Sequence, residues 1–504
     1  MLRRLDKIFL VAFSALFLFF VDQAFAISIV KDVRAAEYDS LVRVVLDIHG
    51  EVNYSWERQG NYIQIKLPDT IFVDDIIPPL VDHIDVLDRV EVKQLPDGAR
   101  VYIYLDHPSY SELYPLSSPN KLVIDLRKDL KEFSRWKVSD GMEFVRVALS
   151  GKGGPVVGSM LKIEPSRFDV IPALAAEIKR EPDFAESFFS FFRPVFFWIG
   201  DEPSHFFREK TSSIAKRENA VAAVNGTYFG RAGEPLGILM IDGDLITFPI
   251  YERTALVISD TGRPAIDKIL LSSYFSITGG VRIEVDGFNE RRASKNEVTV
   301  YTSRYGEKTG TRNCFEVVVR QGKVAEIRGD NSEIPADGYV LSVGKETEDL
   351  VRKYVKPGDA IGLKVELIPY SINGDIKIKH IVGGGPRLIK AGRIYVSKKE
   401  ERFKWDIATT RAARTAVGIT KDGQLLFVTI DKTSRIKSQN GIAPSSGMKL
   451  EELSEFLLSL DVVEAMNLDG GGSSTMVVSG EVMNLPANGH EIAISNVILI
   501  KGKD

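Results

Sequence analysis

The segment AMNLDGGGSSTMVV, residues 465 to 478, combines polar side chains with a permissive backbone. In an extended strand Asn467 and Asp469 point to the same face and Leu468 to the other, because side chains alternate. Glycines and serines follow directly: Gly470, Gly471, Gly472, Ser473 and Ser474. Consecutive glycines allow main-chain N–H groups to approach a ligand, and such a concavity favours an anion such as phosphate. A hairpin with a flexible turn is the alternative.

Polar residues also follow two other apolar runs. The run in AVAAVNGTYF leads into Asn225 and Gly226. The segment VGGGPRLIKAG brings Gly384 and Gly385 to a strand end, and Arg387 could meet a phosphate with two hydrogen bonds. A solvated arginine is the alternative for Arg387.

The segment RAARTAVGITKDG places Arg414 at the start of a strand. The expected hairpin partner, LLFVTID, ends at Asp431. Functional residues often lie where regular elements meet loops, so both residues are candidates. The alternative is a salt bridge between neighbouring strands.

The elements that must position these residues are mainly strands. From residue 220 onward, short apolar runs alternate with glycine-containing turns, as in IDGDLI and KDGQLLFVTI. Helices are expected only near 207–219, 345–355 and 447–460, the last with Ser446 as its N-cap. The pattern predicts an α+β domain with a large, mainly antiparallel sheet.

Residues 27–130 show the alternation of β-strands and an internal repeat. VRVVLDIHGEVNYSW and GARVYIYLDHPSYSEL correspond, and each precedes another strand. We expect a small antiparallel β-sandwich of two similar halves. The pattern resembles the AMIN domain, which implies targeting to the cell wall and contact with peptidoglycan; a generic sandwich is the alternative. We expect residues 131–145 to be a linker and 146–504 a second domain.

The first 26 residues have the form of a secretory signal peptide, with basic residues, an apolar run and the sequence AFA. We therefore expect export to a bacterial periplasm or cell envelope, with an uncleaved N-terminal anchor as the alternative. The Phe-rich segment 184–200 is expected to be core or an inter-domain contact, and a membrane-touching lid is the alternative.

The composition is that of an ordinary globular chain. Of 504 residues, 44% are hydrophobic and 27% charged, and the net charge of −4 gives no global basic field for nucleic acid. Cys314 is the only cysteine, which excludes an intramolecular disulfide framework and a cysteine metal site. The six histidines are scattered without a paired ligand spacing, which argues against zinc.

Five segments resemble the phosphodiester glycosidase family: AVNGTYF, GGGPRLI, RTAVGI, SGMKLEELSEFL and NLDGGGSSTMVV. The resemblance implies hydrolysis of a sugar 1-phosphodiester at the bond between sugar and phosphate, without a cofactor. It assigns to the site Asn225, Arg414, Asp431, Asn467, Asp469 and the 470–474 loop. Glu491 matches an acidic position near the family's C-terminus, but Ile492 stands where an arginine often follows.

We expect Asp469 to act as nucleophile or base, with Asp431 or Glu491 as the second carboxylate. Arg414 and the glycine loops would hold the phosphate, and Asn225 and Asn467 the sugar. One alternative is a phosphodiesterase with a divalent cation bound to Asp431 and Asp469. Another is a non-catalytic envelope protein that binds polysaccharide. A serine hydrolase is weaker, because GGSST lacks the second glycine of G-x-S-x-G.

Overall fold

The computed structural model describes residues 27–503 except for 40, 60–61, 75, 80–83, 85, 107–108, 129–130, 150–153, 177–205, 232, 278–279, 291–296, 372–376, 405–406, 408 and 434–444. The expected signal peptide and the Phe-rich segment 184–200 lie outside the described residues. The chain divides into two compact units, the first mainly residues 1–131 and the second mainly 132–504, and each is described by itself.

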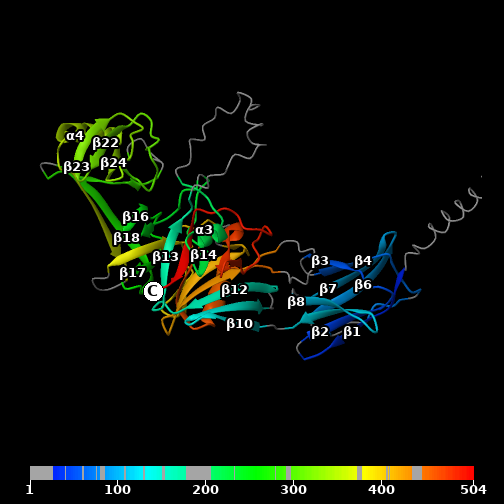
Figure 1. Cartoon of the computed structure of the whole chain (residues 1–504). Coiled ribbons are helices and arrows are strands. Elements are labelled where there is room, and N and C mark those ends of the chain that lie inside the picture. Colours follow the sequence, from blue (N-terminus) through cyan, green and yellow to red (C-terminus); the bar gives the residue numbers. More distant parts are fainter. Residues whose placement is uncertain are drawn as a thin grey trace, which may run out of the picture. The chain divides into compact units, whose positions relative to one another are not determined.

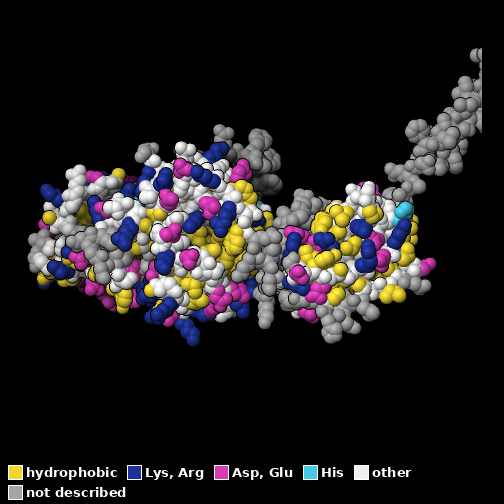
Figure 2. Space-filling model, turned by 90° about the horizontal axis from the view of Figure 1, so that it is seen from below, with side chains coloured by type: hydrophobic (Ala, Val, Ile, Leu, Met, Phe, Trp, Pro, Cys, Tyr) yellow, Lys and Arg dark blue, Asp and Glu magenta, His cyan; other side chains and the backbone are white. Residues whose placement is uncertain are grey.

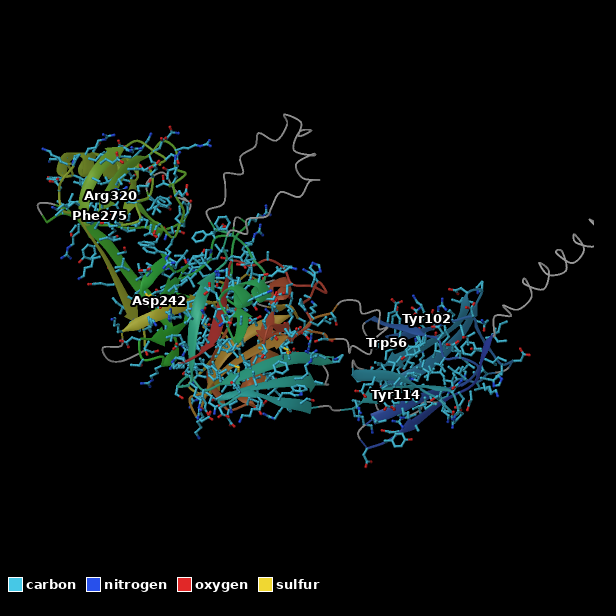
Figure 3. The ribbon with its side chains drawn as sticks, in the orientation of Figure 1. Trp56, Tyr102, Tyr114, Asp242, Phe275 and Arg320 are labelled. Carbon is cyan, nitrogen blue, oxygen red and sulfur yellow. The ribbon has the colours of Figure 1, made fainter. Side chains whose placement is uncertain are left out.

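The first unit is a β-sandwich (Figure 1). One sheet has the order β5-β1-β2-β9-β8, with β5 Thr70–Phe72, β1 Ser28–Glu37, β2 Leu41–His49, β9 Lys121–Arg127 and β8 Tyr110–Leu116. The other has the order β3-β4-β7-β6, with β3 Ser55–Gln59, β4 Tyr62–Pro68, β7 Gly98–Leu105 and β6 Leu87–Leu95. Alternate residues of both sheets, with Trp56 (Figure 3), form one buried core.

The two halves of the sandwich have matching topology. β1 and β2 pair in one sheet and β3 and β4 in the other, while β6–β7 and β8–β9 form the corresponding pairs of the second half. β2 pairs with β9 and β4 with β7 at the centre of each sheet. Each half therefore contributes one hairpin to each sheet.

Residues 131–145 are not a linker, which corrects our expectation. They form β10 (Lys131–Ser139) and the beginning of β11 (Met142–Leu149), joined by a turn at Asp140-Gly141. Asp-Gly between alternating runs is a hairpin signal. β11 buries Met142, Phe144 and Val147, whereas β10 is the edge strand and exposes Ser134, Arg135 and Lys137.

Two sheets of the second unit carry the candidate site. One has the order β10-β11-β12-β30-β29-β31-β27-β28, with β12 Val156–Ile163, β30 Leu425–Ile430, β29 Arg414–Thr420, β31 Val462–Asn467, β27 Arg387–Lys390 and β28 Arg393–Ile394. The other has the order β13-β34-β14-β32-β33, with β13 Phe168–Leu174, β34 Asn496–Gly502, β14 Ala222–Asn225, β32 Met476–Val478 and β33 Glu481–Val482. Strands from the start and the end of the unit thus lie side by side (Figure 1), and both sheets contribute to one core.

A third sheet has the order β16-β15-β26-β17-β18-β19, with β16 Asp244–Thr247, β15 Leu239–Ile241, β26 Ile378–Gly383, β17 Thr254–Ser259, β18 Pro264–Ser276 and β19 Arg282–Glu284. β25 (Gly362–Pro369) also pairs with β18. A fourth sheet has the order β20-β21-β24-β22-β23, with β20 Gly287–Phe288, β21 Thr299–Thr302, β24 Gly338–Val343, β22 Phe315–Arg320 and β23 Lys323–Arg328. Phe275 on β18 and Phe315 on β22 belong to a second core.

The residues that the structure describes form few helices, as expected: α3 Thr211–Arg217, α4 Lys345–Tyr354 and α6 Leu450–Leu458. The expected α+β class with mainly antiparallel sheets is confirmed. Ser446 does not cap α6, because the helix begins at Leu450 and its N-cap is Lys449, whose N–H donates to Glu452 at 3.0 Å. No helix in the described part of the chain is long and apolar enough to cross a membrane. Positive and negative side chains are interspersed on the faces shown in Figure 2.

Candidate active site

The strand ends that carry the candidate residues meet at one edge. β29 runs antiparallel to both β30 and β31, with Arg414 opposite Ile430 and Ala416 opposite Asn467. The beginning of β29 therefore lies beside the carboxyl ends of β30 and β31. β14, from the other sheet, ends at Asn225 and contacts the segment after β31. The sheet topology brings distant motifs together here.

Asn225 holds this junction with its whole side chain. Its Nδ2 donates to the main-chain carbonyl of Asp469 at 2.8 Å. Its Oδ1 accepts from Thr415 Oγ1 at 2.8 Å and from the Thr475 N–H at 3.1 Å. Asn225 is buried, so its amide positions the protein backbone and does not reach a sugar, which corrects our expectation.

Asn467, at the end of β31, forms a second buried cluster. Its Nδ2 donates to the Tyr228 hydroxyl oxygen at 2.9 Å, and that hydroxyl donates to the Gly385 carbonyl at 2.9 Å. Asn467 Oδ1 is buried and has no hydrogen-bond partner among the described residues. Since buried polar atoms are nearly always paired, this oxygen is a candidate contact for a ligand hydroxyl.

Asp469 lies two residues beyond Asn467 and is half-buried. Burial raises the pKa of Asp469 to about 6, although hydrogen bonds from the Ser473 side chain and the Gly470 N–H act in the opposite direction. The Gly470 N–H donates to Oδ1 at 2.9 Å. Leu468 packs into the core, as the expected alternation requires. Asp469 is thus a carboxylate that is ionised near neutral pH but easily protonated.

The glycine loop is not an open nest of N–H donors, and this too corrects our expectation. Four of the five N–H groups of residues 470–474 bond within the protein: Gly470 to Asp469, Gly471 to Ala413, Ser473 to Gly470 and Ser474 to Gly471. Gly471 to Ser473 form a short 3-10 turn, η1. Ser474 Oγ is buried without a partner among the described residues. The loop can therefore contact a ligand through its side-chain oxygens, whereas few of its main-chain N–H groups are available.

Three other glycines are needed because neighbouring groups approach closely. A Cβ on Gly226 would lie 2.1 Å from Asn496 Oδ1, and one on Gly384 would lie 2.7 Å from the Asn467 carbonyl oxygen. Gly385 has φ +96°, and a Cβ there would lie 2.1 Å from Glu401 Oε2. These glycines shape the cradle around Asn467 and need not touch a ligand.

The two predicted phosphate-binding arginines are engaged elsewhere. Arg387 is buried and pairs with Glu464 on β31. Arg414 donates from Nε to the Met448 carbonyl at 3.0 Å and from one terminal nitrogen to the carbonyls of Ile407 and Thr410. Burial lowers the pKa of Arg414. Both side chains hold the protein around the site.

Asp431 directly follows β30 and is only 1% exposed. Its Oδ1 accepts from the Leu485 N–H at 3.1 Å and from Asn484 Nδ2 at 3.3 Å, and Asn484 Nδ2 also donates to the Ser474 carbonyl. Burial raises the pKa of Asp431 to about 6. Asp431 therefore supports the glycine loop from its buried side.

Glu491 lies at the beginning of α3. Its two carboxylate oxygens accept from the N–H and the hydroxyl of Ser212, at 3.0 and 2.5 Å. This geometry makes Glu491 a cap of the helix and gives it no hydrogen bond to the residues around Asp469 within the described chain.

Sequence reasoning missed Tyr228 and Glu401. Burial, followed by the negative charge of Asp469, raises the pKa of Tyr228, so it stays a neutral hydroxyl beside that carboxylate. Glu401 is fully buried and accepts from Thr254 and from the Arg387 N–H. Tyr228 could have been identified from its place in the NGTYF motif, whereas the sequence around Glu401 contains no motif that points to a role.

A hollow of about 640 Å³ lies elsewhere in this unit, among strand-connecting turns. It is lined by Glu164, Pro165, Ser166, Thr261, Gly262, Arg263, Pro264, Asp422, Gly423 and Gln424. None of these residues belongs to the cluster around Asp469. No group of three or more His, Cys, Asp or Glu able to hold a metal occurs in the described part of the chain.

Fold and site together define a β-rich α+β domain with a carboxylate at a glycine-lined strand end. Residues 313–501 match the family described as phosphodiester glycosidase, so this region carries a phosphodiester glycosidase domain. The N-acetylglucosamine-1-phosphodiester alpha-N-acetylglucosaminidase of Bos taurus is 34% identical over 117 residues, which are 21% of this chain and 20% of that protein. The chain thus aligns with about a fifth of this relative.

Two solved structures share the fold. A hypothetical protein from Synechocystis has a TM-score of 0.62 at 19% identity, over 94% of this chain and 81% of that one. A putative exported protein from Burkholderia pseudomallei has a TM-score of 0.54 at 17% identity, over 93% and 99%. At these identities the likeness establishes the architecture alone.

Proposed function

We propose that the second unit hydrolyses a sugar 1-phosphodiester at the bond between sugar and phosphate, releasing the sugar and a phosphomonoester. The observation that carries this proposal is the Asp469 carboxylate, held after β31 beside Gly470–Ser474 and fixed through its carbonyl by Asn225. The similarity to an N-acetylglucosamine-1-phosphodiester glycosidase supports the substrate class.

The residue roles follow from accessibility. Asp469 is the half-buried carboxylate and serves as nucleophile or base at the anomeric carbon. Asn467 Oδ1 and Ser474 Oγ are buried near Asp469 without a hydrogen-bond partner among the described residues. Asn467 Oδ1 accepts a hydrogen bond from a sugar hydroxyl, and Ser474 Oγ donates or accepts one. Asp431 and Glu491 act as structural residues and not as the second carboxylate. A phosphodiester is a good leaving group, so charge stabilisation matters more than an acid.

The test is a panel of sugar 1-phosphodiesters with product analysis. We expect free sugar and a phosphomonoester, and a loss of roughly 10³-fold in kcat for Asp469→Asn. Full turnover by Asp469→Asn would reject the assignment. Sugar 1-phosphate and the free aglycone alcohol as the products, together with inhibition by a chelator, would favour the metal-dependent phosphodiesterase with Asp431 and Asp469 as ligands.

We also propose that the protein is exported to a bacterial envelope and that its first unit, an AMIN-like sandwich, contacts peptidoglycan or another wall polysaccharide. The alternating pattern of β4 and β7 buries Ile63 and Ile103 and turns Tyr62, Tyr102 and Tyr104 outward. The Tyr62 ring centroid lies 6.4 Å from that of Tyr102 and 5.7 Å from that of Tyr104.

Cations border this tyrosine row. Arg89 lies 3.7 Å above the Tyr104 ring, and Lys93 lies 5.1 Å from the centroid of Tyr102, which Figure 3 labels. Flat amphipathic rings of this kind can pack against sugar rings. A pull-down on purified peptidoglycan should retain the whole chain, and Tyr62→Ala/Tyr102→Ala should reduce retention. Tyr38→Ala, at an exposed tyrosine outside the row, is the control; equal retention of all variants would contradict the assignment.

A further inference from the structure

Arg253 lies just before β17 and connects to the site through two rings. Its guanidinium carbon is 4.0 Å from the Phe403 ring centroid, and its Nε donates to the Glu401 carbonyl at 3.2 Å. Phe403 packs against Tyr228, with ring centroids 5.7 Å apart. The Tyr228 hydroxyl is hydrogen-bonded to Asn467, so Arg253 belongs to the same cluster as the strand end that carries Asp469.

The terminal nitrogens of Arg253 have no hydrogen-bond partner among the described residues. Within this part of the chain no carboxylate forms a salt bridge with Arg253, and its side chain donates one hydrogen bond, from Nε. The nearby Glu401 carboxylate is already satisfied by Thr254, Ser397 and the Arg387 N–H. Burial lowers the pKa of Arg253, because the charged form has lost part of its hydration. The negative charge of Glu401 acts on Arg253 in the opposite direction but does not bond its terminal nitrogens. A partly desolvated guanidinium with these donors open favours binding of an anion.

Other donors expected at a phosphate are occupied. Arg414 is bonded to three main-chain carbonyls, Arg387 to Glu464, and most N–H groups of the 470–474 loop to the protein. Ile492 stands close to Gly472, where its Cδ1 would be 3.3 Å from an added Cβ, and supplies no charge. Arg414 uses Nε and one terminal nitrogen for these bonds, so among the described residues of this cluster Arg253 is the cation with both terminal nitrogens open to a ligand.

We infer that Arg253 binds the phosphate of the substrate and stabilises the negative charge that the departing phosphomonoester gains. This inference rests on the proposed function of the second unit. A guanidinium presents two parallel N–H donors that match two phosphate oxygens, and Phe403 and the Glu401 carbonyl hold its plane in place. Asp469 and Arg253 would then act on opposite ends of the same scissile bond.

The experiment is a calorimetric titration of the full chain with inorganic phosphate. Arg253→Gln should weaken binding at least tenfold, and Arg253→Lys should be intermediate because it keeps the charge but loses the paired donors. Arg402→Gln is the matched control: it removes a cation from the same neighbourhood, 4.9 Å above the Tyr251 ring, and should bind within twofold of wild type. Thermal melts establish that each variant is folded. If Arg253→Gln is not folded, the comparison is made between wild type and Arg253→Lys.

The titration is independent of turnover. Phosphate binding that depends on Arg253 supports the inference even if no sugar 1-phosphodiester is hydrolysed, a result that would reject the proposed function alone. Undetectable binding to wild type, or equal binding to wild type and Arg253→Gln, overturns the inference. For an active enzyme, Arg253→Gln should lower kcat/KM most for the substrates with the poorest leaving groups; a uniform loss across leaving groups would overturn the role in charge stabilisation.

Discussion

The side-chain amide of Asn225 donates to the main-chain carbonyl of Asp469 at 2.8 Å; Asn225 ends β14 in one sheet and Asp469 follows β31 in another. The same amide oxygen accepts from Thr415 and Thr475. One buried side chain therefore fixes the position of the candidate catalytic carboxylate relative to both sheets.

Asn225→Asp should impair both stability and activity. The variant loses the donor to Asp469 and buries a carboxylate at a fully enclosed position, so we expect a loss of about 2–4 kcal/mol in the free energy of unfolding. Turnover should fall roughly 10²-fold. Asn289→Asp is the control, because Asn289 is equally buried but donates to Ile246 and Thr302 away from the site. It should lower stability while the folded fraction keeps its kcat; equal kinetic effects would contradict the positioning role of Asn225.

The pH dependence of hydrolysis should report Asp469. Since burial raises its pKa to about 6 and the ionised form is the active one, kcat should fall as the pH decreases through about 6. The Ser473 hydrogen bond lowers this pKa, so Ser473→Ala should move the midpoint of the profile to higher pH. Ser479→Ala, in an exposed turn, should leave it in place. A profile that is flat between pH 5 and 8 would exclude Asp469 as the titrating group.

The variant Glu491→Gln tests whether Glu491 caps a helix or acts as a catalytic carboxylate. The variant has the same shape but replaces one carboxylate oxygen by an NH₂ group that cannot accept from Ser212, so we expect a loss of about 1 kcal/mol in the free energy of unfolding. Its kcat should stay within about twofold of wild type, in contrast to Asp469→Asn. Steady-state kinetics and urea unfolding measure the two quantities. A loss of kcat as large as that of Asp469→Asn would restore Glu491 as the second carboxylate.

The Asp431 carboxyl should make the free energy of unfolding decrease as the pH rises. Its pKa is about 6 when folded and about 4 when unfolded, so the folded state binds more protons in between and stability falls as the pH rises from about 4 to about 6. Asp431→Asn keeps an oxygen for the Leu485 N–H and stays neutral. It should therefore be more stable than wild type above pH 7, by about 1–3 kcal/mol, and equal below pH 4.

Asp422→Asn is the control of opposite sign, because the hydrogen bond from Thr420 contributes to a lowered Asp422 pKa. Its wild-type contribution is lost as the pH falls, so this variant should be slightly less stable at neutral pH and equal at low pH. Urea unfolding at a series of pH values measures both. An Asp431→Asn variant that is less stable than wild type at pH 8 would contradict the prediction.

The sequence alone pointed to the residues that stand in an unusual local pattern. Three consecutive glycines after Asn467 and Asp469 exceed what a turn needs, and the structure places these residues at the junction of two sheets. The hairpin of β29 and β30 was also expected, because a Lys-Asp-Gly turn separates two apolar runs.

Residues whose role depends on a distant partner were misread. Arg387 was expected at a phosphate, but its partner Glu464 lies 77 positions away, and Glu491 pairs with Ser212 across 279 positions. Spacing along the chain carries no information about such pairs. Arg253 and Glu401 were missed for the same reason, since each stands beside other charged residues in a segment without a recognisable motif. The expected linker 131–145 concealed an Asp-Gly hairpin because the edge strand β10 is largely polar.

The junction between the sheets also limits how the protein can be divided. Asn225, Tyr228 and Arg253 all precede residue 313, where the match to the family begins, whereas Asp469 lies within it. A recombinant fragment cut to that match would carry the carboxylate without the amide, the hydroxyl and the cation that surround it. Activity should therefore return only when the two segments are supplied together, which makes hydrolysis a sensitive signal for reassembly of a split protein.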